Sequence, residues 1–148
     1  MRASDLMTGA PQACRPDDPV DRALAHMDER ECGAVPVVDD DRRVVGIVTD
    51  RDILFGIRGN DGRMEGLTVS SCMTEHPVTV RQDDEAADVV RRMRESRIRR
   101  VPVVDDAGAL VGIVAQADLA TRLEDDALLA GYLREVSAAP AVEPAPER

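Results

Sequence analysis

The segment Ala34-Val35-Pro36-Val37-Val38-Asp39-Asp40 decides the fold, because it returns 66 positions later as Arg100-Val101-Pro102-Val103-Val104-Asp105-Asp106. Two shorter segments repeat with the same spacing, namely Gly46-Ile47-Val48 as Gly112-Ile113-Val114 and Met7-Thr8 as Met73-Thr74. When residues 5–53 are aligned with 71–119 without a gap, 19 of the 49 positions are identical. Valine-rich strands that merely look alike would not keep Pro, Gly, Met and Asp in one register, so the match indicates a duplicated structural unit.

Each copy predicts the same order of elements, β-α-β-β-α. A short extended stretch is expected after Pro11 and after Pro77. Asp18 and Asp84 stand where a helix N-cap belongs, with Pro19 at the first helical position of the first copy. Helical spacing then places four apolar residues on one face of each helix: Val20, Ala23, Leu24 and Met27, and Ala86, Val89, Val90 and Met93.

Two valine-rich strands follow in each copy, predicted at 35–38 and 44–48 and at 101–104 and 110–114. Because they are almost wholly apolar, they are expected to be buried on both faces. Pro36 and Pro102 lie inside the first strand of each pair and lack an amide hydrogen, so that strand is expected to be an edge or to lose its pairing there. A unit of this size buries little by itself, so we expect the two units to share one core.

The predicted fold is α/β (α+β), with two repeats packed as a pseudo-twofold pair. We expect the first repeat over 1–62, the second over 63–122, an amphipathic helix over 123–136 and a disordered tail over 137–148. The tail prediction rests on its Ala, Pro and Glu content, which offers no apolar face to bury.

The composition excludes several function classes. The net charge of −10 repels a nucleic-acid backbone, and one Tyr, one Phe and no Trp provide no platform for stacking bases. No apolar run approaches the roughly 18–20 residues that span a bilayer. We therefore expect a cytoplasmic protein without nucleic-acid or membrane partners.

Reactive residues are sparse. Cys14, Cys32 and Cys72 are few and far apart, so a disulfide framework and a cysteine-rich metal site are not expected. For Cys14 we favour a small buried hydrophobe over a redox-active thiol. Neither His26 nor His76 lies near a nucleophile in the sequence, so we expect no catalytic site, no metal and no enzymatic activity.

The segment Gly46-Ile47-Val48-Thr49-Asp50-Arg51-Asp52 has two interpretations. A hydroxyl at a helix N-terminus and a carboxylate three residues later can hold a phosphate oxygen and a ribose diol. Alternatively, Thr49 only caps the helix and Asp52 only complements its dipole. The basic segment 97–100, which enters a buried strand of an acidic protein, supports the first interpretation, because arginine binds phosphate through a two-pronged guanidinium.

The doubled pattern resembles a tandem pair of CBS domains, the Bateman module, over about residues 4–122. The resemblance is carried by Gly46–Asp52 and by Ser96-Arg97-Ile98-Arg99-Arg100-Val101-Pro102-Val103-Val104-Asp105. Within that family the chain is similar to stand-alone actinobacterial two-CBS proteins of the hypoxic response type. The resemblance implies a regulatory module, without a cofactor, that binds an adenine nucleotide in the cleft between repeats, forms a homodimer and acts on a partner protein, here unidentified. The alternatives are a ligand-free interaction module, or one that binds S-adenosylmethionine or an NAD-type ligand.

The resemblance also assigns residues to the ligand site. It implies a hydroxyl and a carboxylate from one repeat, basic residues beside them, and an apolar base pocket; the corresponding residues are Thr49 and Asp52, Arg99 and Arg100, and Ile47, Pro77, Val78 and Ile98. A weaker second site is expected at Asp118, because Ala115 replaces the hydroxyl residue. The positions that match Ile98–Arg100 there are Cys32-Gly33-Ala34, so this second site is expected to hold an uncharged ligand or none.

Overall fold

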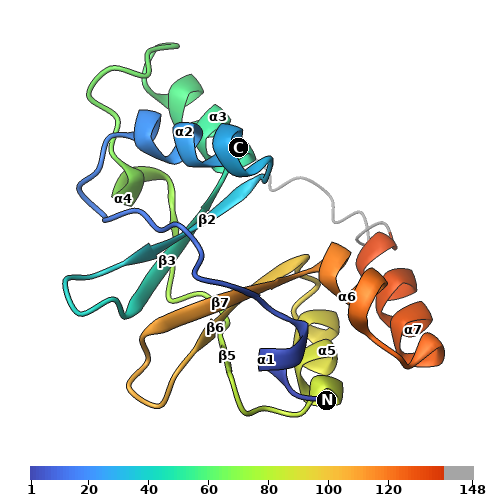
Figure 1. Cartoon of the computed structure of the whole chain (residues 1–148). Coiled ribbons are helices and arrows are strands. Elements are labelled where there is room, and N and C mark those ends of the chain that lie inside the picture. Colours follow the sequence, from blue (N-terminus) through green and yellow to red (C-terminus); the bar gives the residue numbers. More distant parts are fainter. Residues whose placement is uncertain (139–148) are drawn as a thin grey trace.

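The computed structural model describes residues 1–138 and consists of two similar α+β units (Figure 1). The first unit contains α2 (Val20–Arg30), β2 (Ala34–Val38), β3 (Val44–Thr49) and α3 (Asp50–Gly59). The second contains α5 (Ala86–Glu95), β6 (Arg100–Val104), β7 (Leu110–Ala115) and α6 (Gln116–Arg122). Shorter elements and a final helix complete the described chain: α1 (Ala3–Leu6), β1 (Thr8–Gly9), α4 (Val69–Cys72), β4 (Thr74–Glu75), β5 (Val80–Arg81) and α7 (Asp126–Ser137).

The two units exchange their first strands. β1 pairs antiparallel with β7 of the second unit, in the sheet β1-β7-β6-β5, whereas β4 pairs antiparallel with β3 of the first unit, in the sheet β2-β3-β4. Methionine and glycine make both exchanges possible: the sulfur of Met73 lies over Gly46, and that of Met7 lies over Gly112. An added Cβ on either glycine would collide with that sulfur. The repeated Met, Thr and Gly therefore keep one register because each copy must fit the other.

The prolines lie where the sheet needs no amide hydrogen. Cys14 donates its N–H to the carbonyl of Pro36 at 3.0 Å, and Val38 donates to the carbonyl of Cys14 at 2.8 Å. The missing N–H of Pro36 therefore faces an edge where only this short bridge pairs with β2. In the second unit, β5 pairs with β6 only from Val103 onward. The expectation for the two prolines is confirmed.

The predicted N-caps were one residue early. Pro19 is the N-cap of α2, and Glu85 is the N-cap of α5. The carboxylates of Asp18 and Asp84 instead accept N–H bonds from residues three positions earlier, at 2.8 and 2.9 Å. Aspartate forms such local turns as readily as it caps helices, so each one closes the turn that leads into the helix.

Each unit has a core of its own, which corrects the expectation of one shared core. The first core contains Cys14 and Val35, and the second contains Val101 and Met93. Along β2 every residue is buried, whereas β7 alternates between buried and half-buried residues, as does the second half of β3. Burial on both faces therefore holds for the first strand of each pair and not for the second.

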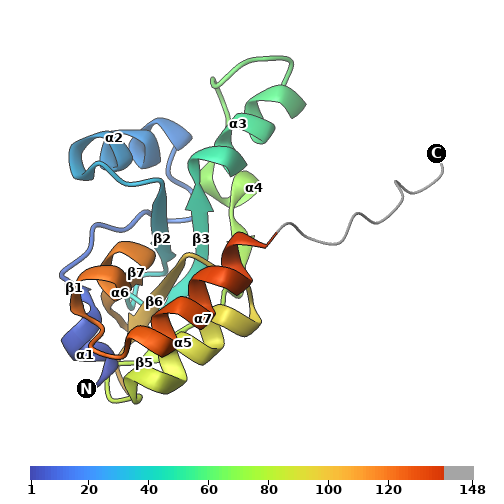
Figure 2. The ribbon, with the colours of Figure 1, turned by 90° about the vertical axis from the view of Figure 1, so that its right-hand side faces the viewer.

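The final helix extends the second core. α7 lies alongside α5 (Figure 2), and its Tyr132 is fully buried in the second core. Of the predicted tail, Ser137 is the last residue of α7, and residues 139–148 lie outside the described part of the chain. Within residues 1–138, no helix has the length and apolar character to cross a membrane.

The N-terminal exchange predicts an unusual stability effect. Leu6 lies in a helix of only four residues, yet it is fully buried in the core of the second unit. We expect Leu6→Ala to lower the free energy of unfolding by about 2–5 kcal/mol, as for other buried leucines. Urea denaturation measures this change, and Met1→Ala, at a 46% exposed position, serves as the control. A loss below about 1 kcal/mol for Leu6→Ala would contradict the packing described here.

Candidate functional site

The start of α3 forms a reciprocal cap. Asp52 donates its N–H to the Thr49 hydroxyl oxygen at 3.1 Å, and Thr49 donates its N–H to Asp52 Oδ2 at 2.9 Å. Thr49 and Asp52 therefore cap α3, which confirms the capping part of the second interpretation. Within residues 1–138, Asp52 Oδ1 accepts no hydrogen bond and the Thr49 hydroxyl donates none. The cap thus fixes both side chains and leaves one acceptor and one donor for a ligand.

Beside this cap is a cavity of about 510 Å³. All eight residues of the predicted ligand site line it: Ile47, Thr49, Asp52, Pro77, Val78, Ile98, Arg99 and Arg100. Sequence reasoning missed five further lining residues, which are Ala34, Thr74, His76, Ser96 and Pro102. Several could have been found from the repeat, because they flank the predicted positions in the aligned copies.

Four segments build the cavity wall, one of them only through Ala34 at the start of β2. The end of β3 and the start of α3 bring Ile47, Thr49 and Asp52 from the first unit. The second unit supplies the chain that leaves β4, with Pro77 and Val78, and the segment that enters β6. The site therefore exists only when both units are packed together.

The polar part of the cavity is positively charged. Arg99 is exposed and Arg100 is half-buried, and neither forms an ion pair within the described residues. A Cβ on Gly33 would lie 3.5 Å from an Arg100 amino nitrogen and 3.3 Å from Asp50 Oδ2. The Arg100 guanidinium and the Asp50 carboxylate at the start of α3 therefore both lie beside Gly33. A flat apolar group, a hydroxyl pair and an anion on one ligand would all find partners here.

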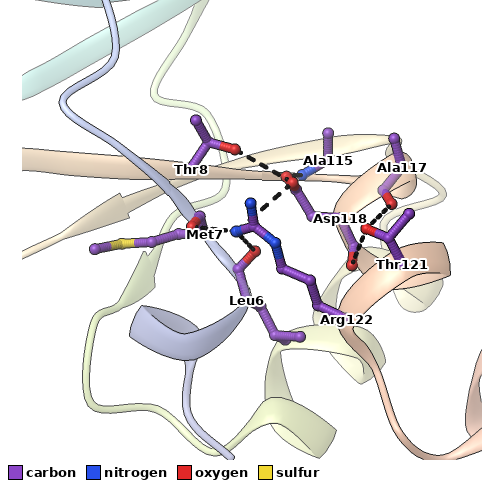
Figure 3. Close-up of polar contacts among 8 residues, drawn as sticks. All are labelled: Leu6, Met7, Thr8, Ala115, Ala117, Asp118, Thr121 and Arg122. Carbon is purple, nitrogen blue, oxygen red and sulfur yellow. Dashed lines mark hydrogen bonds and ion pairs between the residues drawn. The ribbon is translucent and has the colours of Figure 1, made fainter.

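A second cavity, of about 250 Å³, lies at the pseudo-twofold position, with Asp118 in its wall. Both carboxylate oxygens of Asp118 are already used (Figure 3). Oδ2 accepts the Ala115 N–H at 2.8 Å, and Oδ1 accepts the Thr8 hydroxyl at 3.2 Å, with an Arg122 nitrogen 4.0 Å away. Arg122 also donates to the carbonyl of Met7 at 2.7 Å, so it ties the exchanged strand to α6. Asp118 thus accepts a hydrogen bond on each carboxylate oxygen, whereas Asp52 accepts one on Oδ2 only.

The second cavity nevertheless contains positive charge, which the matched segment 32–34 does not supply. Cys32 and Ala34 line it and add none, as expected, but His26 and Arg30 reach it from α2. Arg100 also lines it, so this one guanidinium borders both cavities. Matched positions could have found Arg30 and Arg100, because their counterparts Ser96 and Ala34 line the larger cavity, whereas Arg92, the counterpart of His26, does not line it.

Cys14 is a structural residue. Cys14 is fully buried in the first core, and burial raises the pKa of its thiol to about 11, so it stays neutral at physiological pH. The interpretation of Cys14 as a buried hydrophobe is confirmed. Within residues 1–138, no group of three His, Cys, Asp or Glu side chains is placed to hold a metal ion.

Comparison with known proteins gives consistent results. The sequence model of the CBS domain matches residues 3–59 and 69–125. An uncharacterized protein of Bacillus subtilis, YlbB, is 36% identical over 138 residues, which are 92% of this chain and 91% of that protein.

Three solved structures share the fold. Hypoxic Response Protein I, solved with two coordinated zinc ions, is 29% identical with a TM-score of 0.75, over 83% of this chain and 99% of the other. CBSX2 from Arabidopsis thaliana, solved with AMP, is 31% identical with a TM-score of 0.70, over 80% and 93%. The CBS pair of MJ0100, solved with 5-methylthioadenosine and S-adenosyl-L-methionine, is 27% identical with a TM-score of 0.72, over 81% and 93%. With its duplicated units and the two family matches, this chain belongs to the CBS-domain family and carries two CBS domains in tandem.

Proposed function

We propose that this protein is a regulatory module that binds an adenine nucleotide in the 510 Å³ cavity and passes the bound state to a partner protein. The observation that carries the proposal is the convergence of the Thr49–Asp52 cap, Arg99 and Arg100 on one cavity. The AMP bound to CBSX2 and the adenosyl ligands bound to MJ0100 support it as ligands of related folds. We propose that the module itself catalyses no reaction.

Each part of a nucleotide has a matching group. The base would lie among Ile47, Val78 and Ile98, and the ribose hydroxyls would donate to the free Asp52 Oδ1. The phosphate would meet Arg99 and Arg100, whose charges act against an overall net charge of −10. Because these guanidiniums favour an anion, a nucleotide fits better than the sulfonium cation of S-adenosylmethionine.

A ligand panel tests the function. AMP, ADP, ATP, NAD and S-adenosylmethionine are each added in a thermal-shift assay, where a ligand at a hundred times its Kd adds about 2.7 kcal/mol of stability. We expect an adenine nucleotide to stabilise the protein. Arg99→Ala should weaken AMP binding and leave adenosine binding nearly unchanged, whereas Arg63→Ala, exposed and outside the cavity, is the control. If none of the five ligands stabilises the protein, the proposal is wrong and the protein is a ligand-free interaction module.

The two aspartates provide a matched pair of variants. Asp52→Asn removes a charged acceptor that is free to bind ribose, and such a bond contributes about 1.5–3 kcal/mol. We therefore expect AMP affinity to fall about 10- to 150-fold by calorimetric titration. Asp118→Asn removes the same charge from the equivalent helix start, where both oxygens are already bonded, and should change AMP affinity less than threefold or so. A larger loss for Asp118→Asn would place the ligand in the second cavity.

We also propose a cytoplasmic homodimer, with α3 as the contact. Leu54 and Phe55 on this helix are 68% and 56% exposed. Asp50 begins this helix and Arg58 lies in its last turn, while the Arg51 guanidinium lies over the Phe55 ring, 5.5 Å from its centroid. An antiparallel pairing of α3 with α3 of a second copy would place opposite charges together around an apolar centre, as a twofold contact requires.

Phe55→Asp tests this contact. A buried, unpaired carboxylate at the centre of the contact is strongly unfavourable, so we expect the variant to be a monomer. Light scattering after size-exclusion chromatography measures the mass, with Met64→Asp, outside α3, as the control. A Phe55→Asp variant that keeps the dimeric mass would place the contact elsewhere.

A further inference from the structure

The C-terminal helix makes a direct polar contact with the cavity wall. Tyr132 on α7 is fully buried, and its hydroxyl donates a hydrogen bond to the backbone carbonyl of Ile98 at 2.8 Å. Ile98 lines the 510 Å³ cavity, and Arg99 and Arg100 follow it directly. The Tyr132 hydroxyl therefore holds Ile98, which contributes to the base pocket. Ile98 directly precedes the two arginines that carry the positive charge.

A second contact holds the same segment one residue earlier. Arg97 forms an ion pair with Glu135 of α7 at 3.6 Å. Arg97 has a φ of 50°, a left-handed conformation that a non-glycine residue adopts only at a cost. Glu31, at the equivalent position of the first repeat, has a φ of 51°, so α7 adds two contacts to a turn that both repeats form.

The electrostatics connect Tyr132 with the same guanidiniums. Burial raises the pKa of the Tyr132 phenol above its ordinary value, and the positive charges of Arg99 and Arg100 oppose that rise. Both charges therefore lie close enough to act on the phenol. A phosphate bound to them would change the environment of Tyr132 as well.

The first repeat offers an internal comparison. Its position equivalent to Ile98 is Cys32, which lines the second cavity. In the part of the chain that the structure describes, no side chain donates a hydrogen bond to the Cys32 carbonyl. The contact with α7 is thus specific to one of two otherwise equivalent wall segments.

We propose that Tyr132 is a positioning residue, through which α7 holds the segment 97–100 in the conformation that binds the nucleotide, so that ligand occupancy and docking of α7 are coupled. The coupling rests on the proposed function, whereas the positioning of the segment does not. Because linkage is reciprocal, a helix that strengthens ligand binding is itself held more firmly when the ligand is bound. α7 would then be the element that reports occupancy to a partner.

The first experiment uses Tyr132→Phe, which keeps the buried ring and removes only the hydroxyl. In the ligand-free protein, we expect faster hydrogen exchange of the peptide over 97–101 and unchanged exchange over 31–35, the equivalent segment. AMP affinity should fall roughly three- to tenfold, the effect of one lost hydrogen bond. Glu135→Gln should act in the same direction, while Glu124→Gln, an exposed acid outside α7, should have no effect.

The second experiment measures the reverse effect in the unmodified protein. Tyr132 is the only tyrosine and the chain has no tryptophan, so tyrosine emission comes from this contact alone. We expect AMP to change that emission and to slow hydrogen exchange in α7. Unchanged exchange over 97–101 in Tyr132→Phe overturns the positioning role, and bound AMP without any effect on α7 overturns the coupling. If no nucleotide of the panel binds, the proposed function fails and the coupling fails with it, while the ligand-free comparison still decides the positioning role.

Discussion

The rest of the structure depends on the exchange of the first short strands between the two repeats. β1 completes the sheet of the second repeat and β4 completes that of the first, each fixed by a methionine over a glycine of the partner strand. Each repeat keeps a separate core, so this exchange and the antiparallel bridge between Arg43 and Ala109, rather than a common core, join them. It also sets the position of the cavity, because the chain that leaves β4, where His76 donates its N–H to the Val45 carbonyl, becomes one of its walls.

Duplication gives two equivalent sites, and a few substitutions make them chemically different. Thr49 and Ala115 occupy equivalent helix starts, and both following aspartates accept the backbone N–H of the cap residue. Only Asp118 is also approached by an arginine, because Arg122 stands where the first repeat has Gly56. Asp52 therefore keeps one carboxylate oxygen for a ligand, whereas both oxygens of Asp118 bind groups of the protein itself.

Much of this arrangement could be predicted from the sequence, because the two repeats align with each other without a gap. The strands, the proline positions and the eight residues around the larger cavity follow from matched positions and from the resemblance to CBS pairs. What could not be predicted depends on contacts between elements that the alignment does not relate. Asp18 could close a turn or cap a helix, and only the path of the chain decides between them. His26 reaches the second cavity from α2, whereas Arg92, its match in the other repeat, does not line the larger cavity.

The walls of the larger cavity continue into two different helices, and this limits how a bound ligand could act on the rest of the molecule. Thr49 and Asp52 begin α3, which exposes Leu54 and Phe55, whereas Ile98 is held by α7. The strands between them are buried and hydrogen-bonded, so they resist deformation. The turn at Arg97 leads into the wall segment that begins at Ile98, and Arg97 contacts α7. A ligand between the cap of α3 and the guanidiniums would therefore contact one segment that begins α3 and another that α7 holds.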